Sequence, residues 1–213
     1  MKRKPDYHSL LGKDNPLDHF PLLYGAAMAE FSKKRFEDAS LNDILRKAQM
    51  SKGSLYHHFG DKFGLYLAVI DIIGQRKIEF FTPLMLKGLE GGHFFETVKT
   101  LARETMAFMF QDERMYHLFN RIMEEGRDFL SKLLPYFRYD FGQGFGVLID
   151  AAFASGEIDS RYPRDFVKRT LDLLFSNLHK LTDSQDPEEM YRYLTLSVDM
   201  MRSGLSGQKE QKA

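Results

Sequence analysis

Apolar residues recur along most of this chain at the three- and four-residue spacing of an α-helix, and this regularity constrains the fold more than any other feature. One apolar stripe runs from Phe20 to Phe31, a shorter one runs from Leu41 to Ala48, and a longer one begins at Leu65. The alternation of apolar and polar residues that would indicate β-strands is almost absent. The sequence therefore predicts an all-α protein of about nine helices.

Glycine and proline divide this pattern into elements. We expect the long helix that begins after residue 60 to end at Pro83 or a little beyond, because Gly88 and Gly91 follow. Five further helices are expected near residues 94–110, 113–125, 135–155, 163–182 and 187–204. The polar tail 206–213 is expected to be frayed.

Composition excludes several classes of protein. The 213 residues include no cysteine, which rules out disulfides, thiolate nucleophiles and cysteine-ligated metals, and which suits a reducing compartment. No stretch approaches the roughly 20 apolar residues of a membrane span, and the N-terminus lacks the apolar segment of a secretory signal. We therefore expect a cytoplasmic protein with no membrane partner. Its thirty basic and thirty acidic residues cancel, although residues 1–70 carry a net charge of +3.

Residues 40–62 contain the most informative spacing. Ser40 with Asp43 forms a variant of the capping box, so a helix is expected to start at Leu41. After its apolar face ends at Ala48, a three-residue turn leads to Ser51, which is a good N-cap for a second short helix. Two short helices joined by a tight turn are typical of a helix-turn-helix, whose second helix enters the major groove of DNA.

The second helix, residues 52–58, has few apolar contacts of its own. It turns Leu55 inward, Phe59 follows one turn later, and its other side carries polar and basic residues. Asp61 is expected to cap the next helix and to place Lys62 in its first turn, where an ammonium group and free backbone N–H groups would suit a phosphate. The basic arm Lys2–Lys4 could add phosphate or minor-groove contacts.

These residues resemble the TetR family of transcriptional repressors, most closely over about residues 20–70. The residues that carry the resemblance are Tyr24, Ala26, Ala27, Phe31, Phe36, Ser40, Ile44, Ala48, the run Ser51–Phe59 and Lys62. The family has an N-terminal three-helix helix-turn-helix domain for DNA and a C-terminal helical domain for ligand binding and dimerisation. The resemblance therefore implies domains at 15–65 and 66–205. Past residue 71 it rests on helix number and on Gly156-Glu157-Ile158.

The resemblance also implies roles for individual residues. The positions matching the family's DNA contacts are Ser40, Asn42, Lys52, Gly53, Ser54, Tyr56, His57 and Lys62. His58 is expected to pack or to bind the backbone instead of reading bases. Three departures from the family pattern, Arg35, Leu45 and Gln49, question the detailed geometry and could strain a helix end by about 1 kcal/mol.

The C-terminal part is rich in phenylalanine and methionine, which suit either an ordinary core or an adaptable apolar pocket. The residues that we propose from sequence to line a pocket for a hydrophobic or aromatic ligand are Met106, Met109, Phe110, Phe119, Met123, Phe137 and Phe141. The glycine-rich run 142–146 lacks a preceding strand, so a nucleotide site is not expected there. In the resembling family the last two helices, about 163–182 and 187–204, pair with their copies to form a homodimer.

Together these features predict a ligand-responsive repressor of a pseudo-palindromic operator, needing neither a cofactor nor a metal. Adjacent histidines such as His57 and His58 point about 100° apart on a helix and suit no shared metal ion. Two alternatives remain at this stage. One is a ligand-binding or scaffolding bundle that no longer binds DNA. The other is a helical enzyme, which the absence of a recognisable catalytic motif makes unattractive.

Overall fold

The computed structural model describes residues 6–91, 93–136, 141–176, 181, 182, 184 and 186–205, and the side chains of all of these except Met123, 141–144 and 175–176. The arm Lys2–Lys4, the pocket candidate Phe137 and the tail 206–213 lie outside the described residues, as do the side chains of Met123 and Phe141.

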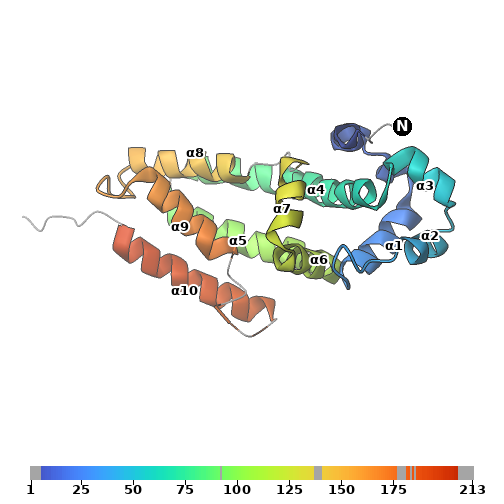
Figure 1. Cartoon of the computed structure of the whole chain (residues 1–213). Coiled ribbons are helices and arrows are strands. Elements are labelled where there is room, and N and C mark those ends of the chain that lie inside the picture. Colours follow the sequence, from blue (N-terminus) through green and yellow to red (C-terminus); the bar gives the residue numbers. More distant parts are fainter. Residues whose placement is uncertain are drawn as a thin grey trace, which may run out of the picture. The chain divides into compact units, whose positions relative to one another are not determined.

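The described residues form ten α-helices, four short 3₁₀ helices and no strand, which confirms the all-α prediction (Figure 1). The α-helices are α1 (Pro21–Phe31), α2 (Leu41–Lys47), α3 (Lys52–Phe59), α4 (Lys62–Gly91), α5 (Phe94–Phe110), α6 (Glu113–Glu124), α7 (Arg127–Leu133), α8 (Phe141–Ala154), α9 (Arg164–Ser176) and α10 (Pro187–Leu205). The 3₁₀ helices are η1 (Tyr7–Leu10), η2 (Gly12–Asp14), η3 (Pro16–His19) and η4 (Leu134–Tyr136).

Two differences from the expected helices have local causes. Gly126 breaks the chain after α6, and the seven-residue α7 that follows is too short to show a clear apolar period. α4 continues past the exposed Pro83 to Gly91, because a proline inside a helix can be accommodated as a kink at the cost of a hydrogen bond.

The chain divides into two compact units. Unit 1 comprises Met1–Ile78 and Met109–Tyr139, and unit 2 comprises Glu79–Phe108 and Asp140–Ala213. The helix-turn-helix therefore shares a unit with α6 and α7, and the chain passes between the units at three places. This division describes compactness, so the functional domains at 15–65 and 66–205 stay a prediction.

Unit 1 is built on the helices that the apolar stripes predict. Its most completely buried side chains include Leu23, Phe31, Ile44, Leu55, Phe59 and Leu65. The predicted caps are in place: Ser40 Oγ accepts the Asp43 N–H at 3.2 Å, and Ser51 Oγ accepts the Ser54 N–H at 3.1 Å. Asp61 accepts the Gly64 N–H at 2.9 Å, as expected for the start of α4. The start of α4 also passes very close to the end of α3, since a Cβ on Gly64 would lie 1.9 Å from the Phe59 carbonyl oxygen.

An N-terminal strap, residues 6–20, packs on α4 in unit 1 and was not predicted from the sequence. The buried Asn15 donates its side-chain amide to the Ala68 carbonyl at 2.9 Å and to the Asp71 carboxylate at 3.0 Å. The Gly12 N–H donates to Asp71 at 2.9 Å, and the Tyr7 hydroxyl donates to Asp61 at 2.7 Å. Because the strap consists of single 3₁₀ turns, no periodic pattern indicates it.

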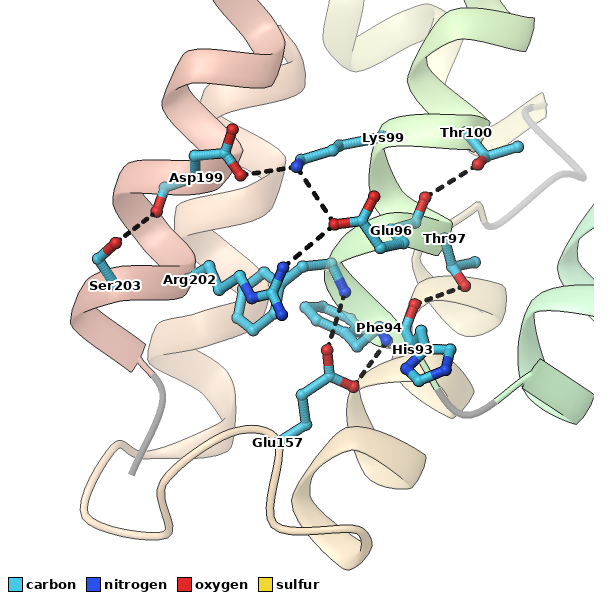
Figure 2. A network of polar contacts seen from close by, with 11 residues as sticks. His93, Phe94, Glu96, Thr97, Lys99, Thr100, Glu157, Asp199, Arg202 and Ser203 are labelled. Carbon is cyan, nitrogen blue, oxygen red and sulfur yellow. Dashed lines mark hydrogen bonds and ion pairs between the residues drawn. The ribbon is translucent and has the colours of Figure 1, made fainter. Parts of the chain in front are cut away.

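In unit 2, polar contacts join the start of α5 to the α8–α9 connection and to α10 (Figure 2). Glu157 accepts the backbone N–H groups of Phe94 and Phe95 at 2.7 and 3.3 Å and so caps α5. Lys99 of α5 pairs with Asp199 of α10 at 2.6 Å. A bulkier residue at Gly88 would collide with Thr97, so α4 and α5 approach closely in this unit.

Candidate nucleic-acid interface

α3 has one buried side and one open side. Leu55 and Phe59 are completely buried, while Tyr56 is 49% exposed and Lys52 and His57 also face solvent. Gly53 is exposed, and a Cβ at this position would make only an ordinary contact, 3.9 Å from Ser51 Oγ. The side opposite the buried residues therefore offers a cation, a phenol and an imidazole on a surface that can approach another molecule closely.

α2 brings two further predicted residues to the surface beside this helix. Ser40 caps α2, and Asn42 in its first turn is exposed. The capping box also predicts that Asp43 accepts the Ser40 N–H, and this prediction is wrong. The Ser40 N–H donates to the Glu30 carboxylate at 2.9 Å, and Asp43 pairs with Arg46 at 2.7 Å instead. A buried acid from α1 has taken the backbone donor that a local residue was expected to satisfy.

Lys62 lies at the start of α4, where its ammonium group is held by internal contacts. It donates to the Glu37 and Ala39 carbonyls, both at 3.0 Å, and lies 4.7 Å from the centre of the Phe36 ring. An ammonium group has three donors, so one remains for a phosphate. Lys62 also fixes the α1–α2 connection, a role that sequence analysis missed.

His58 turns away from the exposed side of α3. Its ring lies 4.9 Å from that of Phe20, which agrees with the expectation that it packs. The three departures from the family pattern are accommodated. Leu45 is buried, Arg35 donates to the Glu124 carbonyl at 3.1 Å, and Gln49 adopts the left-handed conformation at φ 53°.

The predicted pocket residues are divided between the units. Met106 is buried in unit 2, whereas Met109, Phe110 and Phe119 belong to unit 1. Phe119 is 41% exposed on α6, and the Phe110 ring stacks on Tyr116 at 5.1 Å. Whether these side chains line one pocket stays a prediction.

A polar cluster on α1, α4 and α6 was also missed by sequence analysis. The Arg76 guanidinium lies 5.2 Å from the centre of the Tyr24 ring, and Arg114 forms a two-point ion pair with Asp112. Within the described part of the chain the buried Tyr24 hydroxyl makes no hydrogen bond, and burial raises the pKa of this phenol. On the same helix as Arg76, burial lowers the pKa of Lys77 to about 8.

A family model described as "Bacterial regulatory proteins, tetR family" matches residues 23–69, which contain the whole helix-turn-helix. Residues 23–69 are a TetR-family DNA-binding segment. This match confirms the resemblance seen in the sequence and indicates a DNA-binding transcriptional regulator.

Individual relatives extend the likeness beyond residues 23–69. The HTH-type transcriptional regulator BetI of Escherichia coli (strain UTI89 / UPEC) is 25% identical over 182 residues, which are 76% of this chain and 93% of BetI. The structure of FadR from Bacillus subtilis in complex with stearoyl-CoA has a TM-score of 0.70 at 10% identity and covers 87% of this chain and 99% of its own. A putative TetR-family regulator from Mesorhizobium loti MAFF303099 has a TM-score of 0.66 at 20% identity and covers 89% of this chain and 98% of its own. At these identities the two structures show a shared fold alone.

Two further observations concern the described residues only. None of their helices combines the length and apolar character needed to cross a bilayer. Nor do their histidine, aspartate and glutamate side chains gather in any group of three that could hold a metal ion.

Proposed function

We propose that this chain is a homodimeric cytoplasmic repressor whose α3 helices bind a pseudo-palindromic operator. The observation that carries the proposal is the contrast within α3, where Leu55 and Phe59 are completely buried and Lys52, Tyr56 and His57 are exposed. A helix anchored by two side chains presents its free side to a groove without unfolding. Lys52, Tyr56 and His57 would contact bases, and Asn42 would add a base contact from α2. Ser40 and Lys62 would contact phosphates.

Dimerisation would supply the affinity that one short helix lacks. Both α9 and α10 expose large apolar side chains opposite their buried stripes: Phe166, Leu173, Tyr193, Leu196 and Met200. Pairing these faces with their copies would form a four-helix interface and set two α3 helices about one DNA turn apart, roughly 34–36 Å.

The effector is proposed to be a small hydrophobic or aromatic molecule bound within residues 66–205. The FadR structure carries stearoyl-CoA, whose acyl chain is apolar, and this supports a ligand with an apolar part for this fold. Ligand binding would tilt α4 and change the distance between the two α3 helices of the dimer. A coupling free energy of about 1–3 kcal/mol between ligand and DNA would weaken DNA binding roughly 5- to 150-fold. Since this coupling is reciprocal, DNA would weaken ligand binding by the same factor.

The test is selection of duplexes from a random-sequence pool by the purified chain, followed by gel shifts. We expect a palindromic consensus and salt-dependent binding that Lys52→Ala weakens, while Lys87→Ala, which removes an exposed lysine of unit 2, leaves it unchanged. Lys62→Ala should weaken binding to all sequences and reduce the salt slope by about 1. No enrichment in the selected pool would overturn the proposal and favour a bundle that no longer binds DNA.

A further inference from the structure

The α1–α2 connection, residues 32–40, determines where α2 begins. It is held from within the helix-turn-helix by the buried Glu30, whose carboxylate accepts from the Ser40 N–H at 2.9 Å and from the Lys34 ammonium at 2.7 Å. Lys62 holds the same connection from α4, through the carbonyls of Glu37 and Ala39. Its geometry therefore fixes Ser40 and the first turn of α2.

A second set of contacts reaches this connection from the corner between α6 and α7. The Phe36 N–H donates to Glu125 Oε1 at 2.7 Å, and Arg35 Nη2 donates to the Glu124 carbonyl at 3.1 Å. These residues are about 90 positions apart in the chain, yet both hydrogen bonds lie within unit 1. Glu125 thus accepts a backbone N–H of the connection, and Arg35 donates to the last carbonyl of α6, which has no partner within its helix.

Aromatic packing continues this contact along α7. The Phe129 ring lies 4.8 Å from Phe36, 5.6 Å from Tyr66 and 6.2 Å from Phe63. The Tyr136 ring lies 5.7 Å from that of Tyr7 in the strap. Ring pairs at such distances each add about 0.5–1.5 kcal/mol beyond their burial. α7 and η4 are thus packed on the α1–α2 connection, the start of α4 and the strap.

We propose that Glu125 and Phe129 are positioning residues for operator binding, which hold the α1–α2 connection, and through it Ser40 and Asn42, in the geometry that fits DNA. The proposal rests on the function proposed above. The chain enters unit 1 before α6 and leaves it after η4. This segment is therefore tied covalently to unit 2 at both ends, and a displacement of either end reaches α2 through Glu125 as well as through α4.

The test compares Glu125→Ala, Glu125→Gln and a matched control, Glu157→Ala. Glu157 also accepts a backbone N–H, that of Phe94, at 2.7 Å, but it does so in unit 2. The probe is the duplex selected by the wild-type chain, with a scrambled duplex of equal length. We expect Glu125→Ala to weaken binding to the selected duplex by about tenfold and binding to the scrambled duplex by less than about twofold, because phosphate contacts carry the latter.

Glutamine keeps the acceptor oxygen, so Glu125→Gln should bind the selected duplex within about threefold of wild type. Hydrogen–deuterium exchange on the DNA-free chain should show faster exchange at residues 33–40 for Glu125→Ala, but not for Glu125→Gln or Glu157→Ala. Phe129→Leu, which keeps the side chain apolar, should reduce the preference for the selected duplex in the same direction.

Two outcomes overturn the proposal: wild-type affinity of Glu125→Ala for the selected duplex, or unchanged exchange at residues 33–40 in that variant. An equal loss of affinity in Glu157→Ala also overturns it, since the effect would then follow general destabilisation. If the wild-type chain selects no duplex, the proposed function fails, and the exchange measurement still decides whether Glu125 holds the connection.

Discussion

The outward sides of α3 and α10 carry opposite chemistry, although both helices bury an apolar stripe. α3 turns Lys52, Tyr56 and His57 to solvent, whereas α10 exposes Leu196 at 51% and Met200 at 75%. A charged and aromatic surface that water already solvates can exchange that water for DNA, while an apolar stripe gains most by meeting another apolar stripe. The exposed sides of α3 and α10 therefore suit partners of different kinds.

The largest expected effect comes from placing charge on the apolar stripe. Leu173→Glu combined with Met200→Glu should convert the proposed dimer to a monomer, because each buried carboxylate without a partner costs several kcal/mol. Operator affinity should fall by at least about 100-fold, the equivalent of 2.7 kcal/mol. Light scattering and gel shifts measure both effects.

The control is Leu86→Glu, since Leu86 is 57% exposed on α4 and lies outside this stripe. It should leave the molecular mass and the operator affinity unchanged. A double variant that remains dimeric would show that α9 and α10 do not form the interface.

The next prediction contrasts the effects of replacing two neighbouring residues of α3 on stability and on operator binding. Leu55→Ala should lower the free energy of unfolding by about 2–5 kcal/mol, because Leu55 is completely buried. Tyr56→Ala should leave that free energy within about 0.5 kcal/mol but weaken operator binding by about 1–3 kcal/mol. Chemical denaturation and gel shifts on both variants measure this contrast, and loss of stability in Tyr56→Ala would mean that its ring serves the core.

How well each region could be predicted follows from how local its interactions are. Ser51, Leu55 and Phe59 define α3 within nine residues, so spacing alone predicts its cap and its buried side. The partner of the Ser40 N–H could not be predicted, because Glu30 lies in another helix and the local Asp43 is an equally good acceptor by pattern.

The strap and α7 were missed for the same reason. The hydrogen-bond partner of Tyr7 is Asp61, 54 residues away. The aromatic partners of Phe129 include Phe36, which lies far from it in the sequence. Neither segment is long enough to show a helical period. The DNA-binding roles of exposed residues, and the pocket roles of the apolar ones, stay predictions, since no local pattern distinguishes a solvated side chain from a contact residue.

The next prediction concerns how stability depends on pH through the Glu30 carboxylate, which accepts the Ser40 N–H at the start of α2. Burial alone would raise the pKa of Glu30, but hydrogen bonds from Lys34 and the Ser40 N–H, with the nearby lysine charges, lower it below its ordinary value of 4.5. Stability from this carboxylate is therefore complete above pH 4.5 and is lost as the pH falls through the lower, folded-state pKa. Glu30→Gln should cost about 1–2 kcal/mol at pH 7 and less near pH 3.

Urea denaturation of wild type and Glu30→Gln at the two pH values measures this difference. Arg46→Gln, which breaks an exposed pair with Asp43, is the control and should change stability by less than about 0.5 kcal/mol at either pH. An equal cost of Glu30→Gln at both pH values would contradict the assigned role of the carboxylate.

The smallest expected effect comes from the turn between α2 and α3. Gln49 is exposed and has φ 53°, a conformation that favours glycine. Gln49→Gly relieves the strain of the side chain but adds backbone entropy to the unfolded state, so the net gain in stability should be about 0.5 kcal/mol. Because the turn conformation is retained, the outward side of α3 keeps its place and operator affinity should not change. Thermal melts and gel shifts would show both results. A gain in stability accompanied by weaker binding would mean that Gln49 itself contacts DNA, which would extend the polar surface of α3 into the preceding turn.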